Sequence, residues 1–288
     1  MARLIIRETY KLVVLFISIL LISIIPFFVS PEGLQLPSID DLTEFLTELF
    51  TFDNLTYINS ISGVERELFP LILDAFLSTF TVFFSSLFLS VCLALAIAVL
   101  QIFLPRSLRK TITSISTLLQ SIPDIVYVLF SQLLVIIIFR FTDSILFKFT
   151  GSGDDEALFL PIITLSLMPT IYLYRTLVLN IEQEISKTYV ELARSKGLSR
   201  FAIIMRHVMR NILADFVYQL KFIMGLLIGN LFIVEVLFNN FGLTTFLLSF
   251  SQPTVFAVSS VLLFLPIYVV IKSLEISLYI YTGKELDL

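Results

Sequence analysis

The sequence has 288 residues, of which 57% are hydrophobic and 15% are charged, and its formal net charge is −4. Soluble globular domains carry roughly 25% charged residues, so this composition excludes an ordinary soluble domain and predicts a chain that lies in a bilayer. The single cysteine excludes an internal disulfide, the single histidine argues against a metal cage of His and Cys, and no glycine-rich loop for ATP phosphates occurs.

Six apolar segments follow one another along the chain, each long enough to cross a hydrocarbon core of roughly 30 Å as a helix. They span approximately residues 11–30, 70–104, 114–140, 157–180, 217–238 and 255–281. The second is longer than an upright helix needs, which predicts that it tilts or extends beyond the membrane. The first follows basic residues, as in a signal peptide, but no small-x-small cleavage site comes after it, and we expect it to be retained. The sequence thus predicts an all-α integral membrane protein with six transmembrane helices.

The segment between the first two spans is acidic and contains the stretch SIDDLTEFLTELF, in which Ser38 is a candidate helix N-cap. Apolar residues then recur at helical spacing, at Leu42, Phe45, Leu46 and Leu49. This pattern predicts a short amphipathic helix on the outer face. We therefore divide the chain into residues 1–69, the first span with this outer loop, and residues 70–288, a five-helix core with a basic loop at 181–213.

Positive charge is distributed unevenly over this six-span arrangement. All lysines and arginines except Arg66, Arg140 and Lys148 fall on one side of the predicted membrane. Because basic residues are retained in the cytoplasm, we expect both termini and the loop 181–213 to be cytoplasmic.

The basic loop includes the stretch YVELARSKGLSRFAIIMRHVMRN at residues 189–211, which has the pattern of two helices joined by a glycine turn. Gly197 stands where a helix-terminating glycine belongs, and Ser199 can cap a second helix. The first helix is predicted to have one apolar face, made of Ile181, Ile185, Tyr189 and Leu192. The charge could reflect only the positive-inside rule, an amphipathic pair on anionic lipid, or a docking element for a cytoplasmic protein. A nucleic-acid-binding helix-turn-helix is disfavoured because both ends are tied to the membrane.

Glu191, Ala193 and Gly197 form the pattern E-x-A-x-x-x-G, which resembles the signature loop of importer-type ABC transporter permeases. The wider match is to the oligopeptide/dipeptide/nickel branch, covers roughly residues 70–280, and places the outer loop as in B-type permeases. Further residues that carry it are Ser121-Ile122-Pro123, Leu160-Pro161, Tyr172, Arg175, Tyr189-Val190, Arg194, Lys196, Leu198, His207, Arg210-Asn211, Val234-Glu235, Phe238 and Gly242-Leu243. The chain departs from that branch at Asp215, near where a proline is common, and at Ser30-Pro31-Glu32-Gly33, where many members have Gly-Asp-Pro.

The resemblance implies a type I ABC importer permease fold and a permease subunit that forms half of a translocation pathway for peptides. It also implies several partners: a second homologous permease, two cytoplasmic ATP-binding subunits and an outer substrate-binding protein. ATP and Mg²⁺ would bind to the ATPase subunits, so this chain would be no enzyme and would hold no cofactor or metal. The residues implied in ATPase coupling are Tyr189, Glu191, Ala193, Arg194, Lys196, Gly197, His207 and Arg210.

Polar residues within the predicted spans are candidates for the pathway, because ionisable side chains in a membrane are functional candidates by default. The candidates are Pro123, Asp124, Asn230 and Glu235. Asp124 could line a water-filled route or pair with a neighbouring helix, and the sequence does not separate these two. The pair Gly225 and Gly229 permits close helix packing.

Other functions remain open at this point. The same machinery could import nickel or a metal chelate instead of peptides. A membrane-embedded enzyme would need a catalytic group, but His207 has no clear nucleophile partner, and the acidic pair Asp154-Asp155 lies in a loop. A channel or a sensor would not need the basic loop, so its activity should survive a bulky substitution at Gly197.

Overall fold

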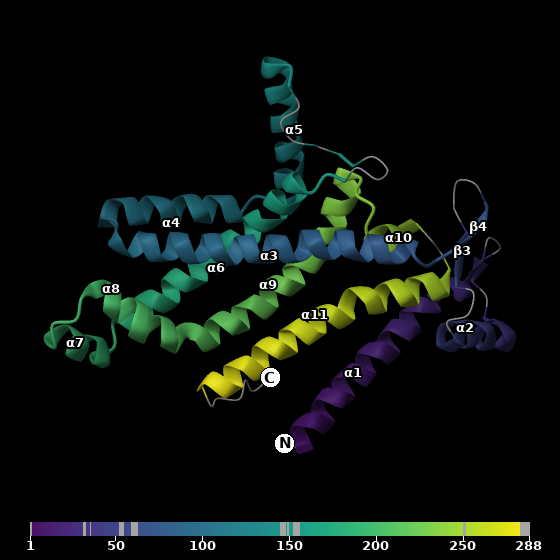
Figure 1. The fold of residues 1–288 in the computed structure, drawn as a ribbon, viewed down its shortest axis with the longest axis horizontal. Coiled ribbons are helices and arrows are strands. Elements are labelled where there is room, and N and C mark those ends of the chain that lie inside the picture. The colour runs from purple at the N-terminus through teal and green to yellow at the C-terminus, as the bar shows by residue number, and fades with distance from the viewer. Residues whose placement is uncertain are drawn as a thin grey trace. The chain divides into compact units, whose positions relative to one another are not determined.

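The computed structural model describes residues 2–30, 33–34, 36–51, 55–58, 63–144, 148, 150–151, 156–249 and 252–282 (Figure 1). Asp154 and Asp155 lie outside these residues, as do Pro31 and Glu32. Within the described part of the chain, six helices are long and apolar enough to cross a membrane, which confirms the predicted number of spans. They are Ile6–Phe28, Leu71–Phe103, Asp124–Thr142, Phe159–Ile185, Arg200–Phe238 and Pro253–Ile280.

The chain forms two compact units. The first unit comprises Met1–Thr79 and Phe241–Tyr268, and the second comprises Phe80–Asn240 and Val269–Leu288. Two long helices, α3 (Leu71–Phe103) and α11 (Pro253–Thr282), contribute residues to both units. The division that we predicted between residues 69 and 70 stays a prediction.

The first unit joins the beginning of the chain to the helices near residue 250. Its other elements are α1 (Ala2–Ser23), the 3-10 helix η1 (Ile25–Phe28), β1 (Val29–Ser30), β2 (Gly33–Leu34), α2 (Ile39–Thr51), β3 (Thr56–Ile58), β4 (Glu65–Glu67) and α10 (Leu243–Ser249). The strands form two antiparallel pairs, β1 with β2 and β3 with β4. The ring of Tyr57 on β3 packs edge-on against that of Phe246 on α10, and both side chains are buried.

Helix α2 forms where the acidic outer segment predicted it. The amide of Asp41 donates to the Ser38 hydroxyl at 3.0 Å, and the Ser38 amide donates to the Asp41 carboxylate at 3.1 Å. These reciprocal bonds satisfy two donors that a helix N-terminus leaves free. Phe45 and Leu49 are buried, but Leu46 is 41% exposed, so the apolar face is narrower than predicted.

The second unit is built around helices α6 and α9. Its elements besides parts of α3 and α11 are α4 (Arg106–Gln120), α5 (Asp124–Thr142), α6 (Phe159–Ile185), α7 (Thr188–Ser195), α8 (Arg200–Ile203), the π-helical segment η2 (Ile204–Val208) and α9 (Met209–Phe238). Helix α6 packs along α9, and α4 and α5 pack on α6. Fully buried aliphatic side chains recur every four residues along both helices, at Leu173, Leu177, Ile181, Ile223, Leu227 and Leu231. Residues four apart share one helix face, so two continuous apolar stripes hold this pair together.

The prediction of one continuous helix over 114–140 was wrong. Helix α4 ends at Gln120 and α5 begins at Asp124, and in Figure 1 the two helices run in different directions. Pro123 is the N-cap residue of α5. Proline donates no backbone hydrogen bond and disfavours helical geometry in the residue before it. The Tyr127 hydroxyl donates to the Leu119 carbonyl at 2.6 Å and so satisfies one acceptor that the break leaves free.

The second helix predicted in the basic loop continues into the fifth span, so that Arg200–Phe238 is one helical run with a π-helical turn near its start. The Gly225 and Gly229 pair does not mediate close packing among the described residues. A Cβ atom added at either glycine would meet nothing within 4 Å.

Candidate functional site

The basic loop 181–213, hereafter the elbow, folds as two capped helices joined by a glycine turn. Helix α7 ends in a Schellman motif: the amide of Gly197 donates to the carbonyl of Arg194 at 2.9 Å, and that of Leu198 to Ala193 at 3.3 Å. These bonds satisfy carbonyls that a helix C-terminus leaves free. Ser199 then begins the next helix, because its hydroxyl accepts from the Ala202 amide at 3.2 Å. The predicted helix, glycine turn and second helix are therefore confirmed.

Gly197 is required by its backbone conformation. Its φ is +78°, in the left-handed region that costs an L-residue roughly 1–2 kcal/mol. An added Cβ would meet nothing within 4 Å, so the requirement concerns backbone conformation and not space for a side chain.

The inward face of α7 differs from the predicted one. Val190 and Ala193 are buried, whereas Leu192 is 58% exposed. Ile181 and Ile185 belong to α6, because that helix continues to residue 185 and α7 begins only at Thr188. The four apolar residues that we placed on one helix are thus divided between two helices of different direction.

A carboxylate that we did not predict as a site residue holds the elbow to both flanking helices. Glu184 lies in the last turn of α6 and is buried, at 7% exposure. Its Oε1 accepts from the Tyr189 hydroxyl at 2.9 Å and from the Asn211 amide nitrogen at 3.0 Å, and its Oε2 pairs with Lys187 at 2.5 Å. One side chain therefore joins the end of α6, the start of α7 and the start of α9. The sequence offered a signal in the Glu184–Lys187 spacing of three residues, which places opposite charges on one helix face.

Tyr189 contributes a donor to this cluster. Burial raises the pKa of its phenol, and the hydrogen bond to Glu184 raises that pKa further. The phenol is therefore protonated at neutral pH, and it can donate its proton to the carboxylate.

The remaining predicted coupling residues face outward. Figure 1 shows α7 and α8 beyond the ends of α6 and α9, at one end of the second unit. The exposed residues among them are Glu191, Arg194, Lys196, Gly197, His207 and Arg210. The elbow thus presents mixed charge on its outer surface, while Tyr189 and Ala193 face the supporting helices.

The predicted pathway residues are brought together only in part. The Asn230 amide of α9 donates to Oδ2 of Asp124 in α5 at 2.9 Å, so the two candidates meet across two spans. They border a pocket with Thr164 and Met168 of α6, which has room for no more than about one water molecule. Oδ1 of Asp124 is sealed from solvent and accepts no hydrogen bond among the described residues. Glu235 does not line this pocket and is buried farther along α9.

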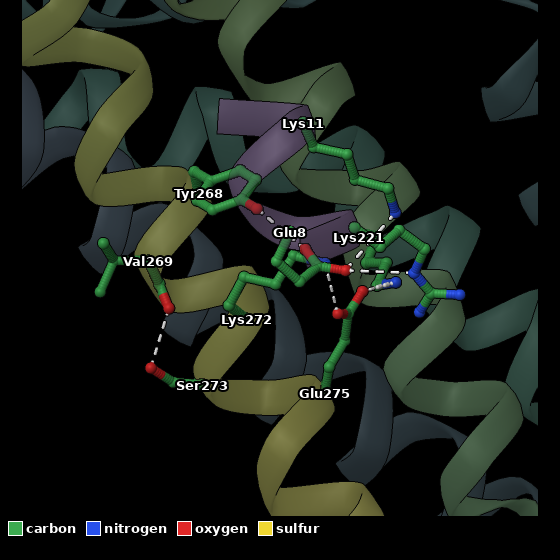
Figure 2. Close-up of polar contacts among 9 residues, drawn as sticks. Glu8, Lys11, Lys221, Tyr268, Val269, Lys272, Ser273 and Glu275 are labelled. Carbon is green, nitrogen blue, oxygen red and sulfur yellow. Dashed lines mark hydrogen bonds and ion pairs between the residues drawn. The ribbon is translucent and has the colours of Figure 1, made fainter. Parts of the chain in front are cut away.

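Sequence reasoning missed an ion cluster within two spans. Figure 2 shows Lys221 of α9 and Lys272 of α11 directed at the carboxylate of Glu275, all in the second unit. The Lys272–Glu275 distance is 2.7 Å, and the three side chains are 14–17% exposed. From the sequence, both lysines are expected only as part of the cytoplasmic excess of positive charge. Figure 2 also shows, within the first unit, the Tyr268 hydroxyl donating to Glu8 at 2.9 Å.

These features define an integral membrane protein that crosses the bilayer several times and carries a hydrogen-bonded helical loop between its fourth and fifth spans. A family model described as binding-protein-dependent transport system inner membrane component matches residues 90–281, and the chain belongs to this family. The predicted ABC importer permease family is thereby confirmed.

The chain is similar to curated relatives. It is 33% identical over 90 residues to the putrescine export system permease protein SapB of Escherichia coli K12, and this match covers 31% of the chain and 28% of the relative. The peptide transport system permease protein SapB of Salmonella typhimurium is 33% identical over 89 residues, with the same coverage. A putative peptide transport system permease protein of Brucella abortus strain 2308 is 25% identical over 222 residues, which is 73% of the chain and 67% of the relative.

A solved structure shares the fold. The inward-facing MetNI methionine ABC transporter superposes with a TM-score of 0.55 and 16% identity, over 71% of this chain and 96% of the matched chain. The predicted fold class, an importer-type permease with six spans, is confirmed. The side of the membrane that the termini face stays a prediction.

Proposed function

We propose that this chain is a permease subunit of an ATP-driven importer and that it forms half of a translocation pathway for peptides. Its family and the peptide transport names of several relatives support this proposal. The partners would be a second homologous permease, two cytoplasmic ATP-binding subunits that hold ATP and Mg²⁺, and an outer substrate-binding protein. The chain itself would bind no cofactor or metal and would catalyse no reaction, and its termini would be cytoplasmic.

The observation that carries the proposal is the attachment of the elbow to two packed spans. Glu184 at the end of α6 holds both Tyr189 of α7 and Asn211 of α9. When ATP closes two ATPase subunits, an elbow lodged between their lobes must follow. Because α6 and α9 pack along their lengths, they would carry that displacement into the membrane, as in alternating access by moving helix bundles.

The exposed residues of the elbow would make the contacts with the ATPase. Glu191, Arg194, Lys196 and Arg210 would supply charge-assisted hydrogen bonds, and His207 would lie beside them. Gly197 and Ala193 would keep the elbow compact through the Schellman motif. Within the membrane, Asp124 and Asn230 would border the pathway next to Pro123, with Glu235 farther along α9.

The proposal is tested by purifying the tagged chain from its native membrane and identifying what comes with it. We expect an ATP-binding subunit and a second permease, and we expect proteoliposomes of the complex to take up labelled peptide only with ATP. The double variant Glu191→Ala/Arg194→Ala should release the ATPase, whereas Arg140→Ala, far from the elbow, should retain it. A chain that transports without any ATPase would overturn the proposal in favour of a channel.

The same purified complex can be used to identify the transported substrate. One relative's name specifies putrescine export, and the family resemblance leaves nickel or a metal chelate as the alternative to peptides. Labelled peptide, labelled putrescine and radioactive nickel are each tested in proteoliposomes. Each is supplied outside the vesicles to measure uptake and, in separate samples, inside them to measure export. Uptake of peptide alone is the expected result, and ATP-driven movement of putrescine or nickel alone would replace the peptide assignment.

A further inference from the structure

A groove lined by cations lies in the second unit between the ends of two spans. It has a volume of about 440 Å³ and is formed by α3, α4 and α6. The side chains that matter for its chemistry are Arg106, Arg109, Lys110, Thr113, Ser114 and Glu182. Three cations thus face the groove with hydroxyl groups and one carboxylate, and this gives it an excess of positive charge and of hydrogen-bond donors.

The cations of the groove have no acceptor within the part of the chain that the structure describes. Arg106, Arg109 and Lys110 form no ion pair or side-chain hydrogen bond there, and Nε of Arg109 is sealed from solvent without a partner. A buried donor that is left unpaired destabilises the folded chain, and the effect is larger when the donor is charged. The half-buried Arg175 of α6, by contrast, donates to Gln120. Glu182, the one carboxylate of the groove, pairs with none of the three cations among the described residues, so an anion from outside the chain can bind at Arg109.

The position of the groove indicates where this anion comes from. Helix α3 ends at Phe103, α6 ends at Ile185, and α4 begins at Arg106. The groove therefore lies at the level where the spans leave the hydrocarbon core, which is the level of lipid headgroups.

The surface beside the groove suits acyl chains. Apolar residues of α4 are exposed, with Leu108 at 48%, Ile115 at 52% and Leu118 at 67%. At the end of α3, Leu100 is 65% exposed and Phe103 is 49% exposed. A basic polar face beside an apolar face is the pattern of a helix in the membrane interface, and basic pockets between spans bind anionic lipid headgroups.

We propose that this groove binds the phosphate headgroup of one anionic phospholipid. Arg109 and Lys110 hold the phosphate oxygens, Arg106 adds charge at the rim, and the hydroxyl of Ser114 donates to the headgroup. A guanidinium binds phosphate through two parallel hydrogen bonds, which suits Arg109 to the central position. The acyl chains run over Leu108 and the exposed end of α3.

The lipid site borders the elbow. Arg109 and Glu182 also line an adjoining pocket of about 130 Å³, and Arg200 of α8 lines that pocket from the elbow. A bound headgroup therefore adds negative charge between the start of α4 and the elbow. The inference depends on the membrane position of α3 and α6 and is independent of the cargo and of the ATPase.

The test measures lipid binding to the purified full-length chain by native mass spectrometry, with phosphatidylglycerol and phosphatidylcholine offered at equal concentration. We expect retention of one phosphatidylglycerol in preference to phosphatidylcholine. Each cation near a membrane surface contributes about fivefold to the binding of anionic lipid. The double variant Arg109→Gln/Lys110→Gln should therefore lower the preference by roughly 25-fold. The charge-preserving variant Arg109→Lys/Lys110→Arg should keep most of it.

The matched control is Arg66→Gln/Arg140→Gln, which removes the same charge at exposed positions that do not line the groove. It should leave the lipid preference unchanged, and equal losses in both double variants would reduce the effect to net charge and overturn the site. Inorganic phosphate is added in a separate arm. If phosphate binds and depends on Arg109 while phosphatidylglycerol is not retained, the groove takes a soluble anion and the lipid assignment is wrong. None of these measurements involves transport, so failure here is distinct from failure of the proposed function.

Discussion

The phenol of Tyr189 donates a 2.9 Å hydrogen bond to the carboxylate of Glu184 and joins the first turn of α7 to the last turn of α6. The Asn211 amide reaches the same oxygen from the start of α9. Two donors from two helices thus converge on one acceptor, which fixes the orientation of the elbow relative to both spans. A loop held only at its two chain ends would have no such constraint.

Removal of the phenol should loosen α7. A hydrogen bond to a charged acceptor contributes roughly 1.5–3 kcal/mol, and Tyr189 is only half-buried, so the lower end of that range applies. We expect Tyr189→Phe to speed hydrogen exchange of the α7 amides about tenfold, since about 1.4 kcal/mol corresponds to a factor of ten. Tyr10→Phe, at a position 69% exposed in α1, is the control and should leave the exchange rates of α7 unchanged. Unchanged exchange in Tyr189→Phe would show that the elbow does not depend on the hydrogen bond between Tyr189 and Glu184.

Substitutions of Gly197 should follow backbone preference more than side-chain size. The residue has a φ of +78° and open space where a Cβ would be. Alanine and leucine should each destabilise the turn by about 1–2 kcal/mol, and asparagine should cost less because it tolerates the left-handed region. ATP-driven uptake by the assembled transporter should fall least in the asparagine variant, and it should fall further and by similar amounts in the alanine and leucine variants. A leucine variant far worse than alanine would point to a steric limit set by a partner surface.

The elements that the sequence predicted well depend on short-range physics. The spans follow from apolar length, because a bilayer core sets the length of helix that it can hold. Ser38, Gly197 and Ser199 were recognisable because caps act over three or four residues. The features that were missed depend on contacts that no local pattern records. Glu184 meets Asn211 only because α6 packs along α9.

The prediction of one helix across Pro123 failed for a different reason. The predicted span 114–140 runs through Pro123, and a membrane helix tolerates a proline where neighbouring groups satisfy the freed carbonyls. The structure supplies such a group in Tyr127, but it serves a helix end and not a kink within one span. The sequence of α4, RSLRKTITSISTLLQ, carried a signal for this break. A helix with a charged and polar face along its length is not expected to cross a membrane by itself.

The Asp124–Asn230 pair allows the two interpretations of Asp124 to be separated. Asn230→Leu removes the one donor that Asp124 has among the described residues and should destabilise the chain by about 2 kcal/mol. Asp124→Asn should cost less, because the new amide oxygen can still accept from Asn230. Thermal unfolding in detergent measures both. If Asp124→Asn keeps its stability but abolishes peptide uptake, the charge serves the pathway, and if uptake is also kept, Asp124 is a helix-pairing residue.

The cluster of Lys221, Lys272 and Glu275 should respond unequally to the loss of its members. Glu275→Gln leaves two ammonium groups close together in a mostly buried position without their carboxylate, and breaking a buried pair costs about 3–5 kcal/mol. Lys221→Met leaves Lys272 and Glu275 as a neutral pair on α11, and methionine can fill the space of the lysine stem, so its cost should be below about 1.5 kcal/mol. Thermal unfolding of the two variants in the same detergent gives the comparison. Each variant removes one charge. A similar loss of stability in both would therefore mean that the sign of the remaining charge has no effect. The cluster would then hold α9 to α11 through packing of the side-chain stems and not through its carboxylate.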